Sequence, residues 1–426
     1  MIIVKNADKS EWPELFKRPA LNVDEIYDRV REIIYHVREE GDQALFEYGR
    51  MFDSVNIQNL SVSENEIAQA GNLVSNELKE AIRIAAENIR KFHMAQLPNN
   101  IEVETTPGVV CWQKAVPVSS VGLYIPGGTA PLFSTVLMLA IPATIAGCDE
   151  IIICSPPNKE GNIDPAILYA ADLVGVNTIF KLGGSQAIAA MAYGTQTVPK
   201  VNKIFGPGNA YVTTAKQIVS LGDVAIDMPA GPSEVLVIAD DSSDPVFVAA
   251  DLLSQAEHGA DSQVILATTS EQLINNVQKE VEVQLAHLPR MKIACESLKN
   301  SRLVLMPSMS TIVEFTNWYA PEHLIIQTEE YVDIVDNIRN AGSVFLGPYS
   351  PESVGDYASG TNHTLPTSGY AKAYSGVNID SFVKKITFQE ISLEGLRRLG
   401  PVAQKLAEAE SLEAHKNAIT VRLNKK

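Results

Sequence analysis

Val121-Gly122-Leu123-Tyr124-Ile125 is a five-residue apolar run that stops at Pro126-Gly127-Gly128 and is followed by a long apolar segment over residues 132–146. A short apolar run, a glycine turn and then a run of helix formers are typical of a strand that enters a crossover helix. The same alternation recurs downstream, and it decides the fold class.

Short β-branched runs alternate with helical segments in two successive parts of the chain. In the first part, strands are expected at 121–125, 151–154, 178–182 and 203–205, with helices at 132–146, 165–173, 187–193 and 209–219. In the second part, strands are expected at 235–238, 264–267, 303–306, 324–326 and 343–346. Alternation of this kind indicates parallel sheets with crossover helices. We therefore expect an α/β protein with two Rossmann-like parallel-sheet domains.

The regions outside these two series are expected to be helical. Residues 23–48 and 63–97 combine charged and apolar residues at helical spacing, and residues 393–418 form a helical tail. The joint between the two series is expected at 227–233, which contains two prolines and a glycine. The expected domains are an N-terminal segment (1–20), a first α/β domain with a helical N-terminal part (21–123 plus 235–377), a second α/β domain (124–234) and a C-terminal helical tail (378–426).

Composition limits the possible function classes. With 426 residues, of which 46% are apolar and 20% charged, the chain is long enough for more than one core. A formal charge of -17 argues against nucleic acid or an anionic membrane as the main partner. The four cysteines lack metal-type spacing, and the N-terminus lacks a signal-type apolar core. These features favour reduced thiols and a cytoplasmic location.

Residues 115–148 carry no charged side chain, which raises the question of a membrane span. A spanning helix needs about 20 uninterrupted apolar residues. Here Pro117, Pro126, Pro131, Pro142 and the glycine pair interrupt the stretch, so a buried strand, a turn and a buried helix are expected instead.

Four of the seven histidines lie in short polar segments marked by glycine or proline, each within one to seven residues of a carboxylate or carboxamide. Such groups can bind a metal or move protons. These histidines are His258, His323, His363 and His415. The other three, His36, His93 and His287, lie in helix-like surroundings and are interpreted as surface or packing residues.

A mixed nitrogen and oxygen ligand set can be assembled from three of these segments. Gln255 and His258 are three apart in the last turn of a helix that begins at Asp244-Pro245, so they share one face. With Asp356 and His415 they would suit zinc in a functional site. Taken singly, each has another interpretation: a histidine favoured by the helix dipole, a turn-forming aspartate, and a histidine that faces water.

Glu322 and His323 are adjacent, and a regular strand would send their side chains to opposite faces. An irregular backbone after Pro321 would let them share a pocket, where a carboxylate and an imidazole can divide two proton transfers. The alternative is an incidental acid–base neighbour pair. The glycines that follow the strands at 121–125 and 203–205 would let a phosphate or adenylate approach the backbone, or they are simply tight turns.

Seven runs, in this order over nearly the whole chain, resemble the histidinol dehydrogenase family. They are Leu123-Tyr124-Ile125-Pro126-Gly127-Gly128, Phe205-Gly206-Pro207-Gly208-Asn209, Ala230-Gly231-Pro232-Ser233-Glu234, Gln255-Ala256-Glu257-His258-Gly259, Ala320-Pro321-Glu322-His323-Leu324, Gly355-Asp356-Tyr357-Ala358-Ser359-Gly360-Thr361-Asn362-His363 and Ala414-His415-Lys416-Asn417-Ala418. Two departures are Ala260, where proline is common, and 371–376, where the family usually carries an arginine-bearing run.

The resemblance implies a zinc-containing, NAD-dependent homodimer that oxidises L-histidinol to L-histidine through histidinal, the last step of histidine biosynthesis. It implies zinc ligands at Gln255, His258, Asp356 and His415, with Glu322 and His323 as the acid–base pair. Implied substrate contacts are Ser233, Gln255, His258, His323, Asp356, His363, Glu410 and His415. Implied NAD contacts are Tyr124, Gln186 and Asn209.

The family places its C-terminal segment in the partner's active site, so Glu410 and His415 would serve the other subunit. They are five residues apart, about 140° around an ideal helix. They could therefore flank one ligand only if the helix ends or bends between them.

Two other functions are compatible with parts of this pattern. A zinc hydrolase acting on a small amine-bearing substrate would use the same ligands and Glu322 without NAD, but the chain has no H-E-x-x-H helix, and the glycine turns would lack a purpose. A two-lobed binding protein would have no need of the adjacent Glu322 and His323.

Overall fold

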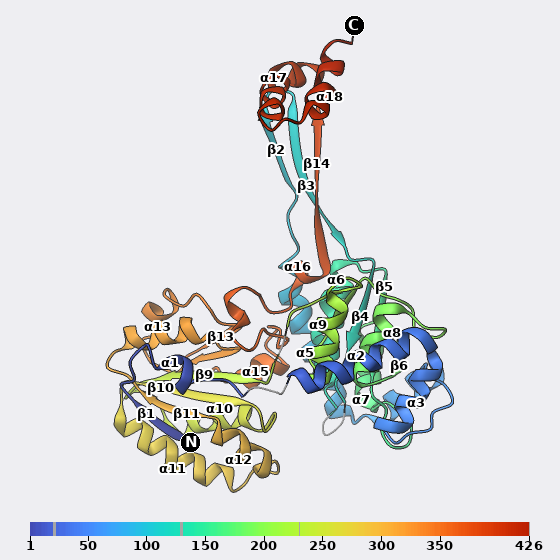
Figure 1. Cartoon of the computed structure of the whole chain (residues 1–426). Coiled ribbons are helices and arrows are strands. Elements are labelled where there is room, and N and C mark those ends of the chain that lie inside the picture. The colour runs from blue at the N-terminus through green and yellow to red at the C-terminus, as the bar shows by residue number, and fades with distance from the viewer. Residues whose placement is uncertain (20–22, 128–130, 230, 426) are drawn as a thin grey trace.

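The computed structural model describes residues 1–19, 23–127, 131–229 and 231–425. Gly128, at the end of the expected glycine turn, and Ala230, in the expected joint, lie outside the described residues. Two α/β lobes lie side by side, and a thin arm rises from them with the C-terminus at its tip (Figure 1).

One lobe is built on a five-stranded parallel sheet with the order β6-β5-β4-β7-β8. Four helices that follow its strands bury apolar side chains against it, as expected for a parallel sheet covered on both faces. The strands are β4 (Ser120–Tyr124), β5 (Glu150–Ser155), β6 (Thr178–Lys181), β7 (Lys203–Phe205) and β8 (Ala225–Ile226). The helices are α6 (Phe133–Ala146), α7 (Pro165–Leu173), α8 (Gly184–Tyr193) and α9 (Ala210–Ser220).

Four N-terminal helices pack on this same lobe. They are α2 (Val23–Glu40), α3 (Asp42–Phe52), α4 (Glu64–Leu73) and α5 (Asn76–Met94). α2 packs on α8 and α9, α4 on α7, and α5 on α6. This packing differs from the expected grouping of residues 21–123 with 235–377, because the apolar face of an amphipathic helix does not reveal which sheet it will cover. The division of the chain into folding domains stays a prediction.

The other lobe is built on a six-stranded parallel sheet with the order β1-β11-β10-β9-β12-β13. Its strands are β1 (Ile2–Lys5), β9 (Glu234–Ala239), β10 (Gln263–Thr268), β11 (Arg302–Leu305), β12 (His323–Ile326) and β13 (Ser343–Leu346). Its helices are α1 (Trp12–Leu15), α10 (Pro245–Ala256), α11 (Glu271–Leu285), α12 (Met291–Lys299), α13 (Met309–Tyr319), α14 (Val332–Val335) and α15 (Glu352–Tyr357), followed by the 3-10 turn η1 (Tyr370–Lys372). Apart from β1, this sheet repeats the strand order of the first, so the prediction of two similar α/β units is confirmed.

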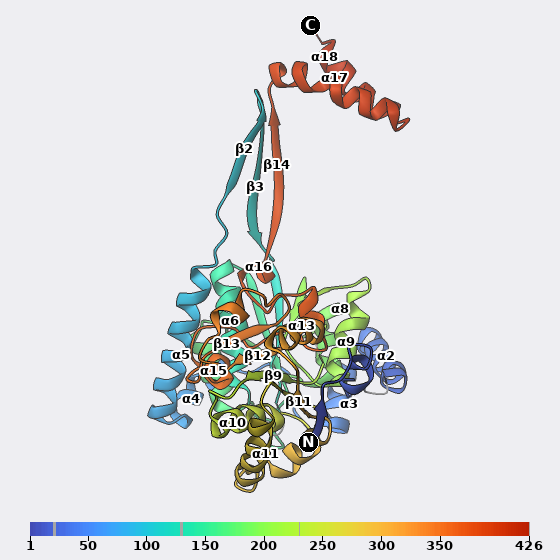
Figure 2. The ribbon, with the colours of Figure 1, turned by 90° about the vertical axis from the view of Figure 1, so that its left-hand side faces the viewer.

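The arm is a three-stranded antiparallel sheet that carries two helices at its tip (Figure 2). Its strands are β2 (Ile101–Thr106), β3 (Val109–Pro117) and β14 (Val383–Ile391), and its helices are α17 (Leu393–Ala409) and α18 (Glu413–Leu423). The short α16 (Ile379–Phe382) leads from the body into β14. The prediction of a helical tail over 378–426 was therefore wrong for β14, although it was right for the last two helices.

The uncharged stretch over 115–148 forms the end of β3, the strand β4 and the helix α6. Residues 134–143 of α6 are all buried inside the first lobe, which confirms the buried strand and buried helix expected there. None of the helices in the described part of the chain has the length and apolar content of a bilayer-spanning segment.

The two sheets direct opposite ends of their strands toward the space between the lobes. In the five-stranded sheet it is the carboxyl end of β4 and β7, between which the strand order reverses. In the six-stranded sheet it is the amino end of β9 and β12. Loops at a point of strand reversal diverge and leave a crevice, so this region is where a site is expected.

Candidate active site

A cavity of about 550 Å³ lies between the lobes, and we call it the Glu322 cavity. Its wall includes Gly206 and Asn209 from the first lobe and Ser233, His258 and Glu322 from the second. Tyr370, in the turn before the divergent segment 371–376, also lines it. Residues as far apart in the sequence as Gly206 and Tyr370 are therefore brought to one site.

Glu322 lines this cavity and His323 lies beside it, after an irregular stretch of backbone. α13 ends at Tyr319, and Ala320 has a positive φ of 54°, a left-handed conformation that is uncommon outside glycine. Glu322 then precedes the first residue of β12, and its Oε2 lies 3.5 Å from Nδ1 of His323. Both side chains are buried.

The His323 ring links two of the predicted zinc ligands. Its Nδ1 lies 2.8 Å from Nε2 of Gln255, and its Nε2 lies 3.2 Å from Oδ1 of Asp356. Burial alone would lower the pKa of His323, but the carboxylates of Glu322, Glu352 and Asp356 raise it well above the ordinary value. Burial would raise the pKa of Asp356, but the hydrogen bond and charge of His323 lower it.

One predicted zinc ligand, His258, lines the Glu322 cavity, and two others, Gln255 and Asp356, lie against the His323 ring beside it. Oε1 of Gln255 is buried without a hydrogen-bond partner, so this carboxamide oxygen is available as a ligand. His258 lies in the turn just after α10, beyond the helix that was expected to hold it, and reaches the cavity. Loss of water around His258 lowers its pKa although Asp356 opposes this effect, so its ring is the neutral form that metals bind.

The fourth predicted zinc ligand does not lie with the other three. Within the described ranges, no group of three or more histidine, cysteine, aspartate or glutamate side chains could hold a metal ion. The fourth predicted ligand, His415, is exposed in the first turn of α18 at the tip of the arm, away from the lobes (Figures 1 and 2). Glu410 is exposed there too, at the end of α17. Ser411, with a φ of 60°, separates the two helices, so the break required between Glu410 and His415 is present.

His363 connects the two lobes beside the Glu322 cavity. Its Nδ1 lies 2.8 Å from the carbonyl oxygen of Asp356, and its Nε2 lies 3.2 Å from Oγ1 of Thr135 on α6. His363 therefore lies in the wall of the Glu322 cavity and contacts both lobes. His93, interpreted as a packing residue, is fully buried with Nδ1 2.9 Å from the Ile89 carbonyl oxygen.

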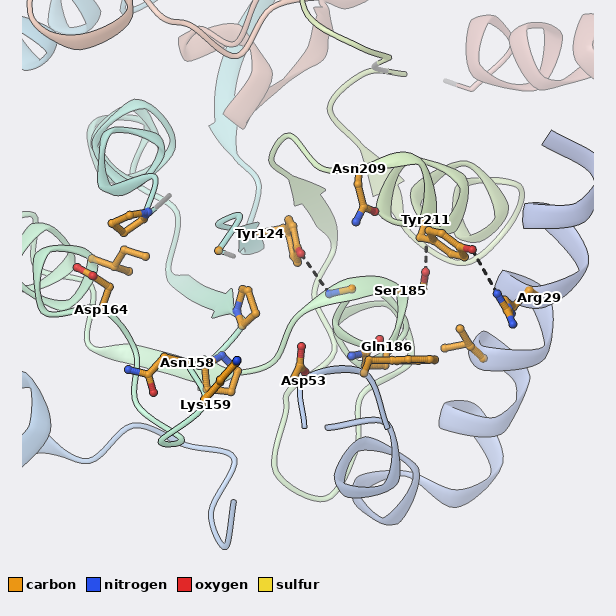
Figure 3. A pocket seen from close by; sticks show the side chains of 18 of the residues that line it. Arg29, Asp53, Tyr124, Asn158, Lys159, Asp164, Ser185, Gln186, Asn209 and Tyr211 are labelled. Carbon is orange, nitrogen blue, oxygen red and sulfur yellow. Dashed lines mark hydrogen bonds between the residues drawn. The ribbon is translucent and has the colours of Figure 1, made fainter. Parts of the chain in front are cut away.

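A second cavity of about 720 Å³, here the Tyr124 cavity, lies at the carboxyl ends of β4 and β7 (Figure 3). The three predicted NAD contacts, Tyr124, Gln186 and Asn209, all line it. The Tyr124 hydroxyl accepts a hydrogen bond from the Gly184 N–H at 3.1 Å. Burial raises the pKa of Tyr124 to about 12, so the phenol keeps its proton.

The loop after β7 is shaped by glycine and held by a buried ion pair. Gly206 has a φ of +124°, and a side chain there would collide with the carbonyl oxygen of Tyr124. Lys216 donates to the Gly206 carbonyl at 2.8 Å, Asp227 accepts from the Gly206 N–H at 2.9 Å, and the two side chains form a salt bridge. The loop delivers Asn209, which caps α9 and lines both cavities.

Several site residues were missed by the sequence analysis. Glu352, in the first turn of α15, is buried near His323; burial raises its pKa to about 8, and its Oε2 has no hydrogen-bond partner. Arg29, Asp53 and Tyr211 line the Tyr124 cavity, and burial raises the pKa of Asp53 to about 6. None of them stands in a segment marked by histidine or by paired glycines, which were the signals used.

Two opposed α/β lobes, a buried carboxylate beside an imidazole, and a second cavity in the first lobe define a two-lobed α/β protein. The chain is similar to known proteins over its whole length. A sequence profile of histidinol dehydrogenase matches residues 16–423. The histidinol dehydrogenase of Bacteroides thetaiotaomicron is 63% identical over 424 residues, covering 100% of this chain and 99% of that protein. The Escherichia coli histidinol dehydrogenase is 55% identical and covers 96% and 94%.

Among solved structures, the crystal structure of histidinol dehydrogenase from Elizabethkingia anophelis superposes with a TM-score of 0.97 at 55% identity, covering 99% of this chain and 98% of that one. The chain therefore belongs to the histidinol dehydrogenase family, a family of oxidoreductases.

Proposed function

We propose that this protein oxidises L-histidinol to L-histidine through histidinal, with two molecules of NAD and one zinc ion per active site. The observation that carries the proposal is that Asn209 stands in the wall of both cavities. A nucleotide in the Tyr124 cavity and a substrate in the Glu322 cavity would then meet at this residue. Similarity to proteins named histidinol dehydrogenase supports the choice of substrate.

Zinc would be held by Gln255, His258 and Asp356, with His415 of a second copy as the fourth ligand. The free Oε1 of Gln255 and the neutral ring of His258 support this assignment. When bound, zinc supplies a Lewis acid that orients the imidazole and amine of the substrate, and NAD supplies the hydride acceptor. Ser233 and His363 line the cavity where the substrate would lie.

The protein's own residues divide the proton transfers between the two oxidation steps. The His323 imidazole, acting in its neutral form, takes the hydroxyl proton of the alcohol, releases it to water, and later takes that of the hydrated aldehyde. Glu322 takes a proton from water so that the water can add to the aldehyde. Oε2 of Glu322 accepts the N–H of Glu234 at 2.8 Å, which leaves Oε1 to face the water. Because both side chains are buried, the aldehyde would be held away from bulk solvent.

The active unit would be a cytoplasmic homodimer in which the arm of one copy reaches the Glu322 cavity of the other. Apolar side chains on the arm support this arrangement, since Phe388, Val402 and Leu406 are 38%, 54% and 62% exposed in the single chain. Glu410 of the second copy would then contact the amine of the substrate. No nucleic acid or membrane takes part in the proposed reaction.

The test is turnover of L-histidinol with NAD, followed by NADH absorbance and by product analysis. We expect two NADH and one histidine per histidinol, loss of activity with a chelator, and recovery on adding zinc. Binding of histidinol without NADH formation would indicate a binding protein instead. Hydrolysis of an amine-bearing ester or amide by the zinc-loaded protein without NAD would indicate the hydrolase.

Replacing Glu322 by glutamine should impair aldehyde oxidation more than alcohol oxidation. We expect Glu322→Gln to slow the oxidation of added histidinal by about 100-fold or more, because general-base catalysis of water addition is lost. The first NADH formed from histidinol in a single turnover should slow by less than about tenfold. Glu330→Gln, an exposed position with the same charge change, is the control. Equal losses in the two steps would contradict this division of roles.

A further inference from the structure

We propose that Arg18 and Glu234 are positioning residues that hold the Glu322 carboxylate in place for the aldehyde step. The inference rests on the proposed function. It adds two residues that are not among the predicted zinc, substrate or NAD contacts. The link runs from the N-terminal segment through the side chain of Glu234 to its backbone, and from there to Glu322.

The first part of the link is a two-point ion pair. Nε of Arg18 donates to Oε1 of Glu234 at 2.5 Å, and Nη2 donates to Oε2 at 2.9 Å. The Glu234 side chain is only 3% exposed, and its Oε1 also accepts the N–H of Ser368 at 2.8 Å. A planar guanidinium that meets a carboxylate at two points fixes both distance and orientation.

The second part of the link is the backbone of Glu234, which touches three site residues. Its N–H donates to Oε2 of Glu322 at 2.8 Å. Its carbonyl oxygen lies 3.4 Å from Nε2 of Gln255 and 3.3 Å from Nδ1 of His323. The side chain that Arg18 holds and the peptide that orients the site therefore belong to one residue, at the first position of β9.

Arg18 also holds the turn that delivers Glu322. Its Nη2 donates to the carbonyl oxygen of Tyr319 at 2.8 Å, and its guanidinium lies 3.9 Å from the centre of the Tyr319 ring. Tyr319 is the last residue of α13, directly before the left-handed Ala320. One guanidinium thus fixes both sides of the contact between Glu234 and Glu322.

The two catalytic side chains depend on this link to different degrees. Within the described residues, the carboxylate of Glu322 accepts one hydrogen bond, from the Glu234 N–H, and otherwise lies only beside the His323 ring. His323 has two further anchors, Gln255 and Asp356. Loosening Glu234 should therefore displace Glu322 more than His323. It should accordingly slow the aldehyde step more than the alcohol step.

The test uses Arg18→Lys, which keeps the charge but loses the two-point geometry, together with Glu234→Gln as a second variant in case the first folds poorly. We expect oxidation of added histidinal to lose about 10- to 100-fold in kcat, the range that follows from misplacing a catalytic group by about 1 Å. The KM for histidinal and NAD and the single-turnover rate of the alcohol step should change by less than about threefold.

The matched control is Arg302→Lys. Arg302 is also partly buried and also ties the N-terminal segment to the second lobe, through Nε to the Leu15 carbonyl at 3.0 Å. It does not bond Glu234, so the variant should alter thermal stability without changing the ratio of the two half-reaction rates. If the Arg18 and Glu234 variants likewise leave that ratio unchanged, the proposal is overturned.

A crystal structure of Arg18→Met gives a readout that needs no activity. We expect Oε2 of Glu322 to move out of hydrogen-bond distance of the Glu234 N–H, while His323 keeps its contact with Asp356. An unmoved Glu322 carboxylate would overturn the positioning role even if turnover falls. If the wild-type protein forms no NADH from histidinol, the proposed function fails, and the crystal structure still decides the positioning role.

Discussion

Asp251 is a buried carboxylate inside α10, four residues before Gln255. It accepts a hydrogen bond from Nε2 of Gln327, and Oε1 of that glutamine is buried without a partner. Burial raises the pKa of Asp251 from 3.8 to about 7, with the Gln327 hydrogen bond opposing the rise. Asp251 is therefore a group whose ionisation the folded protein resists.

The direction of the pH effect follows from this raised pKa. Below about pH 4 the carboxyl is protonated in both the folded and the unfolded chain, so burial costs no ionisation energy. Between about pH 4 and 7 the unfolded chain releases the proton while the folded chain keeps it, so the free energy of unfolding falls as pH rises. Above pH 7 the loss is complete.

Asp251→Asn should remove this pH-dependent loss. Asparagine keeps an oxygen for Nε2 of Gln327 and adds a donor for the unpartnered Oε1. We expect the variant to gain on the order of 2 kcal/mol relative to the wild type between pH 5 and pH 8, since each unit of pKa shift is worth about 1.4 kcal/mol. Melting temperatures at the two pH values measure this gain.

Asp172→Asn, the same substitution at an exposed position of α7, is the control and should shift the melting temperature equally at both pH values. A melting-temperature difference between Asp251→Asn and the wild type that is the same at pH 5 and pH 8 would show that Asp251 is ionised without cost in the folded protein.

At the scale of residues, the sequence predicted those positions that carry a local signal. Glu322 and His323 are adjacent, and Gln255 lies at the end of α10 with His258 directly after it, so short-range spacing was enough to select them. Arg18 and Glu234 are 216 residues apart, and neither lies beside a histidine. Only the folded chain brings such a pair together, because nothing local in the sequence marks a long-range ion pair.

At the scale of elements, all nine predicted strands are present within about two residues of their expected ends. Each of them belongs to a parallel sheet, and most are buried and therefore read as largely apolar runs. The strands β2, β3 and β14 were missed because their sheet stands in the arm and buries little in the single chain. In β14 the alternation of Ile386 and Phe388 with polar residues was present, but charged neighbours concealed it.

The ends of α17 and α18 show a second limit of sequence reasoning at this scale. Residues 393–418 were expected to form a helical tail, and the sequence left open whether the helix ends or bends between Glu410 and His415. The chain breaks at Ser411, whose positive φ is unusual for serine. No proline or glycine marks this break, so propensity alone could not place it. The break nevertheless sets Glu410 and His415 at one end of the arm.

At the scale of the whole molecule, one chain holds the parts of the proposed site in two places. His258 lines the Glu322 cavity, Gln255 and Asp356 contact His323 beside it, and His415 lies in α18 at the tip of the arm (Figure 1). If a second copy completes the site, a chain with a substitution in its lobes and a chain with a substitution in its arm should together form one intact site. Closed twofold dimers exchange the same surface in both directions, so each dimer would hold two such sites.

Two purified heterodimers of equal composition decide between a shared and a single-chain site. The first pairs a chain carrying His258→Ala with a chain carrying His415→Ala. The second pairs a wild-type chain with a chain carrying both substitutions. If the arm serves the partner, the first heterodimer has one intact site and should retain about half of the wild-type activity, whereas the second has none. If each arm served its own body, the pattern would reverse, because only the wild-type chain of the second heterodimer would be complete. Both heterodimers contain the same two alanines, so a general loss of stability cannot account for opposite activities.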